Sequence, residues 1–267
     1  MMIKRFIKRW FALMIPSSAL ALQPLAFFYG QQIPMDHFKQ YEQIVVTPNP
    51  SIDPARYDDE THHLMAYVAI SEIIDPNQYG KPIDPAWILG QNPNWNTWIL
   101  DQSNPEWRHY FIENIITPLW NQGYRGFFID TLDSYQLVTQ LPTQQFIQQQ
   151  GLILLIKQIK QRFPEAKLII NRGFELVPII YPLLNGVVAE SLYSGWNNAE
   201  QRYYETSIDD QQYLIQKLEQ VQAYGLPVTV IDYLDPAKQS EATSLAQKIA
   251  TLNFYPWITN ADLTAWY

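Results

Sequence analysis

The chain has 267 residues, with 18 Lys and Arg against 26 Asp and Glu, and it contains no cysteine. A net charge of −8 disfavours binding to nucleic acid or to an anionic membrane surface, because both repel an acidic protein. The absence of cysteine excludes disulfides and thiol chemistry, so the stability of the fold must come from its core. The length suits one large domain, such as a barrel.

The first 21 residues have the pattern of a secretory signal peptide. Four basic residues lie between Lys4 and Arg9, a short apolar stretch follows, and an A-x-A cleavage site ends at Ala21. Pro16 interrupts the apolar stretch and disfavours a full transmembrane helix, although an uncleaved N-terminal anchor is the alternative. Cleavage would leave a domain of residues 22–267 with a net charge of −12 and no stable membrane span. We therefore expect a secreted or periplasmic protein.

Eight short apolar runs recur along the rest of the chain. Each is nearly continuous, which is typical of parallel strands that are covered on both faces. The runs are Leu25–Tyr29, Gln43–Thr47, Leu64–Ile70, Gly126–Asp130, Lys167–Asn171, Val187–Glu190, Val228–Asp232 and Phe254–Ile258.

Amphipathic helices are predicted between the later runs. One begins at Asn104-Pro105, with Asn104 as its cap, and Pro118 is expected to kink it or end it early. The others carry apolar residues within Leu152–Phe163, Leu214–Val221 and Leu245–Leu252. Strands alternating with helices predict an α/β fold, a (β/α)8 TIM-type barrel with a single domain. The segment from Glu72 to Ser103 is too long for an ordinary loop and is expected to fold over the barrel mouth.

Two acids stand at the ends of predicted strands, where the active-site face of such a barrel lies. Asp130 ends the fourth apolar run and Glu190 ends the sixth. A carboxylate at the end of a buried strand is costly, because desolvation opposes its charge. The two strands lie two apart around the ring, so the pair can face each other as the acids of a glycosidase do. The alternative is structural, with Glu190 capping a turn and Asp130 paired with Arg172.

Further polar and aromatic residues near the same edge are candidates for substrate binding, since aromatic rings stack on the apolar faces of sugars. They are Tyr29, Tyr67, Glu72, Trp98, Asp101, Asp133, Asn171, Tyr193, Trp196, Asp232, Tyr233 and Trp257. Asp133 has the alternative role of ordering the loop after Asp130. The four histidines are scattered, and no phosphate-binding or dinucleotide-binding motif occurs, so we expect no metal and no cofactor.

Segments around these acids resemble a known family. FFIDTLDSY at 127–135, NRGFEL at 171–176 and AESLYSGW at 189–196 resemble the endo-α-1,4-polygalactosaminidase-type glycoside hydrolases of family 114, in particular the hydrolase domains that process the Pel exopolysaccharide. FFYG at 27–30 and WNTWILDQSNPEWR at 95–108 extend the resemblance over roughly residues 24–267. It implies a (β/α)8 barrel that acts on α-1,4-linked galactosamine or N-acetylgalactosamine polymers. It also implies that Asp130 is the nucleophile and Glu190 the general acid/base.

These observations predict an exported endo-glycosidase that cleaves an amino-sugar polysaccharide by a retaining mechanism with two carboxylates. A partly deacetylated galactosamine polymer is cationic, and the negative charge of the chain would attract it. Two other classes stay open. One is a non-catalytic polysaccharide-binding protein on a degenerate barrel, and the other is an envelope scaffold that uses the barrel as a docking surface.

Overall fold

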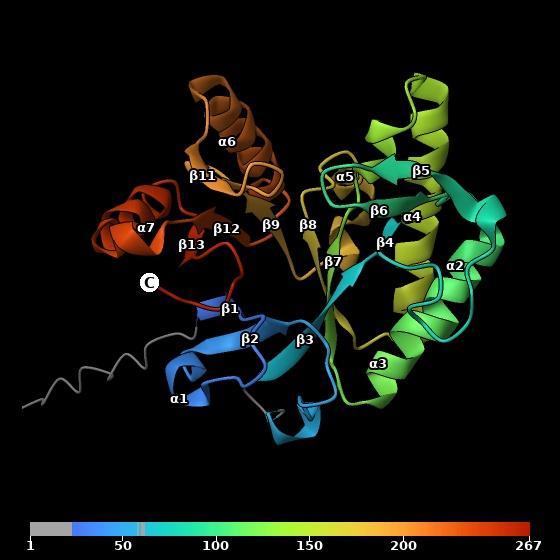
Figure 1. Ribbon diagram of the computed structural model, residues 1–267, viewed down its shortest axis with the longest axis horizontal. Coiled ribbons are helices and arrows are strands. Elements are labelled where there is room, and N and C mark those ends of the chain that lie inside the picture. The colour runs from blue at the N-terminus through green and yellow to red at the C-terminus, as the bar shows by residue number, and fades with distance from the viewer. Residues whose placement is uncertain (1–22, 58, 60–61) are drawn as a thin grey trace, which may run out of the picture.

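The computed structural model describes residues 23–57, 59 and 62–267, so the predicted signal peptide lies outside the described residues. Eight parallel strands form one sheet that curves into a nearly closed barrel (Figure 1). In their order around the barrel they are β1 (Gln23–Phe27), β2 (Tyr41–Val46), β3 (His63–Ala69), β7 (Gly126–Asp130), β8 (Lys167–Asn171), β9 (Gly186–Glu190), β12 (Val228–Tyr233) and β13 (Tyr255–Thr259). All eight predicted strands are confirmed, with ends that differ by two residues at most.

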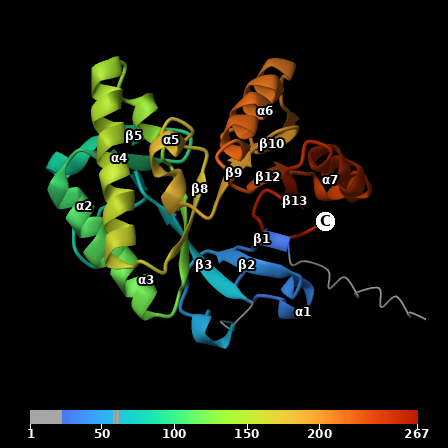
Figure 2. The same cartoon turned by 180° about the vertical axis from the view of Figure 1, so that it is seen from behind.

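Helices cover the outside of the barrel, and Figure 2 shows several of them along one side. The helices are α1 (Met35–Phe38), α2 (Pro105–Phe111), α3 (Thr117–Asn121), α4 (Pro142–Arg162), α5 (Val177–Ile180), α6 (Ile208–Gln222) and α7 (Ala242–Ala250). Short 3-10 helices lie at Pro54–Arg56, Pro85–Trp87, Ser134–Leu137, Tyr181–Leu183 and Pro236–Glu241. Among the described residues, none of the helices combines the length and the apolar character that a membrane span requires.

The predicted start of α2 is confirmed, because the Asn104 side chain accepts a hydrogen bond from the N–H of Glu106 at 2.8 Å. Pro118 was expected to kink this helix or end it early, and the early end is not found. A π-helical turn at Ile112–Ile116 carries the helix on into α3, and Pro118 lies in the first turn of α3. Proline is tolerated in a first turn, so the helical path continues to Asn121.

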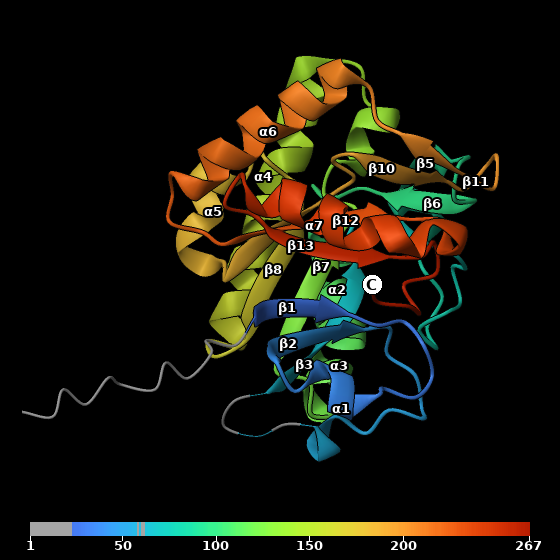
Figure 3. The same ribbon diagram turned by 90° about the vertical axis from the view of Figure 1, so that its left-hand side faces the viewer.

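Two excursions leave the barrel at its carboxyl end. The long stretch after β3 forms an antiparallel sheet of β4 (Glu72–Ile73), β6 (Thr97–Leu100) and β5 (Ile88–Asn92), in that order. The stretch after β9 forms a hairpin of β10 (Ser194–Asn197) and β11 (Arg202–Glu205). Figure 3 shows the small sheet and the hairpin at the same end of the molecule. Their turns meet where Asn198 Nδ2 donates a hydrogen bond to the carbonyl of Asn94 at 3.2 Å.

Packing joins the two outer strands of the main sheet. Among the described residues no backbone pairing links β1 to β13. Instead, the N–H of Tyr29 donates to the carbonyl of Leu263 at 2.8 Å, and the Phe27 ring lies 6.2 Å from the Trp257 ring. Phe27 also meets Phe128 edge-on at 5.2 Å. The barrel is therefore closed by an aromatic core.

Replacing Phe27 with alanine is expected to lower the free energy of unfolding by about 3–5 kcal/mol, because the buried ring would leave a cavity at this closure. Urea denaturation monitored by tryptophan fluorescence measures the loss. The matched control is Leu154→Ala on the exposed side of α4, which is expected to stay within about 0.5 kcal/mol of the wild type. Similar losses in both variants would contradict a specific role for Phe27 in closing the barrel.

Candidate active site

Three neighbouring strands end in side chains that meet at the carboxyl end of the barrel. β7 ends at Asp130, β8 at Asn171 and β9 at Glu190. Asn171 pairs with Val188, which lies two residues before Glu190. Because side chains alternate between the two faces of a strand, Asn171 and Glu190 point to the same side of the sheet.

One amide group holds both carboxylates. Asn171 Nδ2 donates to Asp130 Oδ1 at 2.9 Å and to Glu190 Oε1 at 2.8 Å. The two carboxylate oxygens are therefore no farther apart than the sum of these distances, about 5.7 Å, a range in which like charges repel strongly away from bulk water. The structure thus brings together the two acids that the sequence singled out, and it adds Asn171 as the link between them.

Tyrosine hydroxyls complete the hydrogen bonding of the pair. Tyr67 on β3 donates to Asp130 Oδ2 at 2.9 Å, and Tyr233 at the end of β12 donates to Glu190 Oε2. The Tyr29 ring packs edge-on against Tyr67, with 5.6 Å between the ring centres. Burial raises the pKa of all three hydroxyls well above the usual value, and the two carboxylates raise it further. The hydroxyls therefore keep their protons and remain hydrogen-bond donors.

The pKa of Glu190 is raised above its usual range. Burial is the main cause, and the negative charge of Asp130 adds to it. The hydroxyl of Tyr233, the amide of Asn171 and the charge of Arg172 lower the pKa, but the first two effects outweigh them. Glu190 therefore holds a proton at a higher pH than a free glutamate does, as a general acid requires.

Asp133 and Arg172 lie at the edge of this cluster. Burial raises the pKa of Asp133, and the nearby charge of Arg172 lowers it. The sequence predicts Arg172 as a possible ion-pair partner of Asp130. In the structure its charge acts on both Asp133 and Glu190. In the sequence, only its position directly after Asn171 places it near the active-site end of the barrel.

The backbone turns sharply after β7 and β8. Thr131 and Arg172 have φ values of 66° and 55°, in the left-handed region that residues other than glycine rarely adopt. Thr131 is secured there by its hydroxyl, which donates to the carbonyl of Asp130 at 2.7 Å and accepts from the N–H of Ser71 at 3.0 Å. Such backbone strain is concentrated at functional sites.

Asp232, predicted to bind the substrate, does not face this cluster. Ile231 pairs with Glu190, and Tyr233 shares its face, so Asp232 between them points to the opposite side of the sheet. Its side chain is fully buried, and it accepts hydrogen bonds from the backbone N–H groups of Leu192 and Tyr193. The structure therefore corrects its role from substrate contact to support of the backbone.

Glu72 is a second correction. It is only 4% exposed, because it lies in the small sheet with its side chain covered by β5, β6 and the 3-10 helix after β7. Its carboxylate accepts hydrogen bonds from Asn92 Nδ2 at 3.1 Å, from Ser134 Oγ at 2.5 Å and from Thr97 Oγ1. These buried partners leave it as a structural link between the two segments.

Trp257 is a third correction, because its ring belongs to the core and not to a sugar-stacking surface. It is 3% exposed. The rings of Phe27, Phe38 and Tyr41 surround it at 6.2, 6.1 and 5.5 Å. The apolar surface that suggested sugar binding instead closes the barrel.

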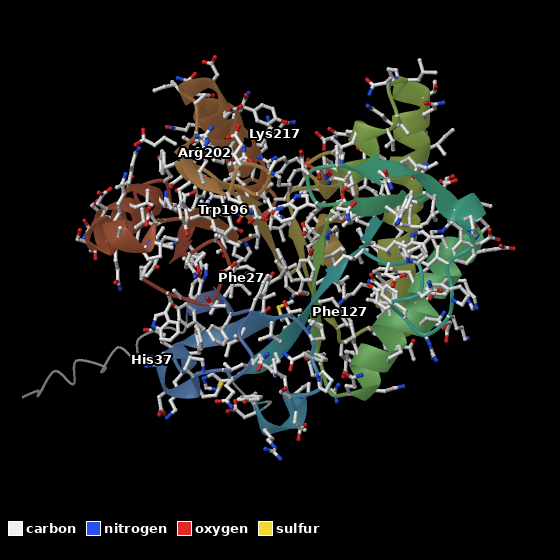
Figure 4. The ribbon with its side chains drawn as sticks, viewed as in Figure 1. Phe27, His37, Phe127, Trp196, Arg202 and Lys217 are labelled. Atoms are coloured by element: carbon white, nitrogen blue, oxygen red, sulfur yellow. The ribbon has the colours of Figure 1, made fainter. Side chains whose placement is uncertain are left out.

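Four other predicted binding residues lie outside the hydrogen-bonded cluster, and their roles stay predictions. Trp196 is half-buried on the hairpin, where Figure 4 labels it, and meets Tyr203 edge-on at 4.9 Å. Tyr193 is half-buried, with Lys248 Nζ 3.5 Å from its ring centre. Trp98 packs partly buried against the core. Asp101 accepts from Ser103 and Gln148 near the start of α2. Within the described part of the chain, no group of three or more His, Asp or Glu residues is arranged to hold a metal ion.

The chain matches one protein-family model and is similar to solved structures of glycoside hydrolases. Residues 44–267 match the model of glycoside-hydrolase family GH114. The glycoside hydrolase domain of PelA from Pseudomonas aeruginosa is 28% identical, with a TM-score of 0.79 over 91% of this chain and 96% of that one. Aspergillus fumigatus Ega3, solved in complex with galactosamine, shares the fold at 12% identity, with a TM-score of 0.64 over 92% of this chain and 93% of that one. A comparison with curated proteins gave no match.

The substitution Asp130→Asn is expected to lower the pKa of Glu190, because it removes the neighbouring negative charge and leaves the burial in place. A carboxyl-carbon NMR titration of the glutamates measures the shift. Asp209→Asn on the exposed first turn of α6 is the charge-matched control and should leave the pKa of Glu190 unchanged. An unchanged pKa of Glu190 in Asp130→Asn would show that the two acids do not interact.

Proposed function

The chain belongs to glycoside-hydrolase family GH114 and is a glycoside hydrolase, and on this basis we propose that it is an exported endo-enzyme acting on galactosamine-containing exopolysaccharide. The observation that carries the proposal is the pair Asp130 and Glu190, held side by side by the amide of Asn171. The proposed substrate is an α-1,4-linked polymer of galactosamine or N-acetylgalactosamine, and the proposed outcome is retention of the anomeric configuration.

The spacing of the two acids supports retention. Retaining glycosidases place their carboxyl groups about 5–5.5 Å apart, whereas inverting enzymes need about 6.5–9.5 Å to admit a water molecule. The shared amide limits the separation of Asp130 Oδ1 and Glu190 Oε1 to about 5.7 Å, which favours direct attack by one carboxylate.

The environments of the two acids support a division of roles. Asp130 receives hydrogen bonds from Tyr67 and Asn171, which hold its carboxylate in a fixed orientation. Glu190 has a raised pKa and so retains a proton to donate. In the first step Asp130 attacks the anomeric carbon, and Glu190 gives its proton to the departing glycosidic oxygen. In the second step Glu190 takes a proton from water, the water oxygen bonds to the anomeric carbon, and Asp130 is released as a carboxylate.

The charge coupling between the acids suits both steps. Once Asp130 is esterified by the sugar it carries no charge, so one of the two causes that raise the pKa of Glu190 is removed. Glu190 then loses its proton more readily and can act as a base. The Tyr233 hydroxyl accepts as well as donates hydrogen bonds, so its contact with Glu190 persists in both protonation states.

Charge and sequence support the substrate class and the export. The chain carries a net charge of −8, which attracts a partly deacetylated and therefore cationic amino-sugar polymer. Ega3, which has the same fold, was solved with galactosamine. The signal-peptide pattern in residues 1–21 supports export.

Purified residues 22–267 are expected to release reducing ends from partly deacetylated α-1,4-galactosaminan. Asp130→Asn and Glu190→Gln are each expected to lower kcat by at least about a thousandfold, because each removes a group that takes part in both steps. A reducing-sugar assay across amino-sugar polymers measures this, and Asp209→Asn serves as the control that keeps full activity. Polymer binding without new reducing ends in the wild type would favour the non-catalytic alternative instead.

The configuration of the first product tests the mechanism separately. Proton NMR during the first minutes of hydrolysis should show the α-anomer before mutarotation, because two displacements at the anomeric carbon restore its configuration. Initial appearance of the β-anomer would show a single displacement and would refute Asp130 as nucleophile.

A further inference from the structure

The segment Ser191–Ser194, hereafter the 191–194 segment, joins the strand that carries Glu190 to the hairpin. Its backbone leaves the barrel sheet directly after Glu190 and is held by residues from other elements. The carbonyl of Tyr193 accepts from the N–H of Thr206 at 3.0 Å. The hydroxyl of Ser194 donates at 2.5 Å to the carbonyl of Tyr233, whose own hydroxyl donates to Glu190. A shift of this segment would therefore disturb Glu190 directly.

Asp232 supplies the acceptors for the N–H groups of this segment. Its Oδ1 accepts from the N–H of Leu192 at 2.6 Å and from the N–H of Tyr193 at 3.2 Å, and its Oδ2 accepts from the N–H of Tyr193 at 3.0 Å. The Asp232 carboxylate thus accepts the hydrogen bonds that a neighbouring strand would otherwise accept, because the chain after Glu190 no longer pairs in the sheet. It is fully buried, so no water replaces these bonds if they are lost.

The chemistry of the contact favours a charged carboxylate. An ionised aspartate is an acceptor at both oxygens, which matches two backbone donors. A protonated aspartic acid carries an O–H on one oxygen, which leaves the other oxygen as the main acceptor for both N–H groups. Charge-assisted bonds of this kind are also about twice as strong as neutral ones.

We propose that Asp232 is a positioning residue that fixes the 191–194 segment beside Glu190 only while its carboxylate is ionised. Protonation removes the negative charge and one full acceptor, which weakens the bonds to the N–H groups of Leu192 and Tyr193, and the segment loses its fixed place next to the acid pair. Turnover by the proposed hydrolase then falls on the acidic side, through a group that never touches the substrate. This consequence for turnover rests on the proposed function, whereas the control of the segment does not.

The surroundings of Asp232 bring its pKa close to neutral pH. Burial raises its pKa to about 7, against the lowering effects of the N–H groups of Leu192, Tyr193 and Ser194 and of the Lys248 ammonium. The charge of Lys248 acts on it from α7, where the ammonium also lies over the ring of Tyr193. Burial raises the pKa of the Tyr193 hydroxyl, and the charge of Asp232 raises it further. On β13 its pairing partner is Ile258, which is apolar.

Amide NMR on the wild-type protein tests the inference without a substrate. The amide proton shifts of Leu192 and Tyr193 should titrate together with a midpoint at about 7, because their hydrogen-bond acceptor changes charge there. The titration should vanish in Asp232→Asn. The matched control is Asp235→Asn, which removes an acid three residues away that accepts from the N–H of Ala237. It should leave the titration unchanged.

Kinetics on galactosaminan supply the second readout. In the wild type kcat should fall as the pH drops through about 7, and this step should be absent in Asp232→Asn. At pH 8 the variant should be slower by about tenfold, the effect of losing a hydrogen bond to a charged group. A purely structural role would lower stability and leave the shape of the pH profile unchanged.

The two readouts together test both the role of Asp232 and the proposed function. Amides that do not titrate, or an acidic step in kcat that survives in Asp232→Asn, would overturn the inference. Amides that titrate as expected in a protein that hydrolyses no amino-sugar polymer would support the role of Asp232 in the 191–194 segment and overturn the proposed function.

Discussion

The side-chain amide of Asn171 sets the spacing of Asp130 and Glu190, and the rest of the site is arranged around that spacing. A single nitrogen with two hydrogens serves both acids, so neither can move away without leaving a buried donor unpaired. The repulsion between the carboxylates is what raises the pKa of Glu190 beyond the effect of burial. The distance that permits direct attack by one acid therefore also keeps the proton on the other.

The fold was largely predictable from local patterns. Parallel strands covered on both faces are nearly continuous in apolar residues, and the eight runs gave eight strands in chain order. Asn104 signalled the start of α2 because capping depends only on neighbouring residues. The path through Pro118 was harder to predict, because a π-helical turn shifted the hydrogen-bonding pattern ahead of the proline. Such shifts depend on packing against the barrel as well as on the local sequence.

The acid pair was predictable because each member ends a strand, whereas the orientation of the surrounding residues was not. Asp232 and Tyr233 are neighbours at one strand end, yet only one of them can face the barrel interior. The choice is set by register with β9, which no local pattern reveals. The predicted substrate-binding roles of Glu72 and Trp257 were wrong for a related reason. Their partners come from segments distant in sequence, so their burial depends on the assembled fold.

The burial of Asp232 also sets how folding depends on acidity. An unfolded aspartate has a pKa of about 3.9, whereas burial raises the pKa of Asp232 to about 7. Between these values the folded chain keeps a proton that the unfolded chain has already released. The contribution of this group therefore favours folding most in acid and declines as the pH rises through this window. Above neutrality the ionised side chain orders the backbone beside Glu190, but its contribution to the free energy of unfolding is lost. The group therefore favours activity and stability at different pH values.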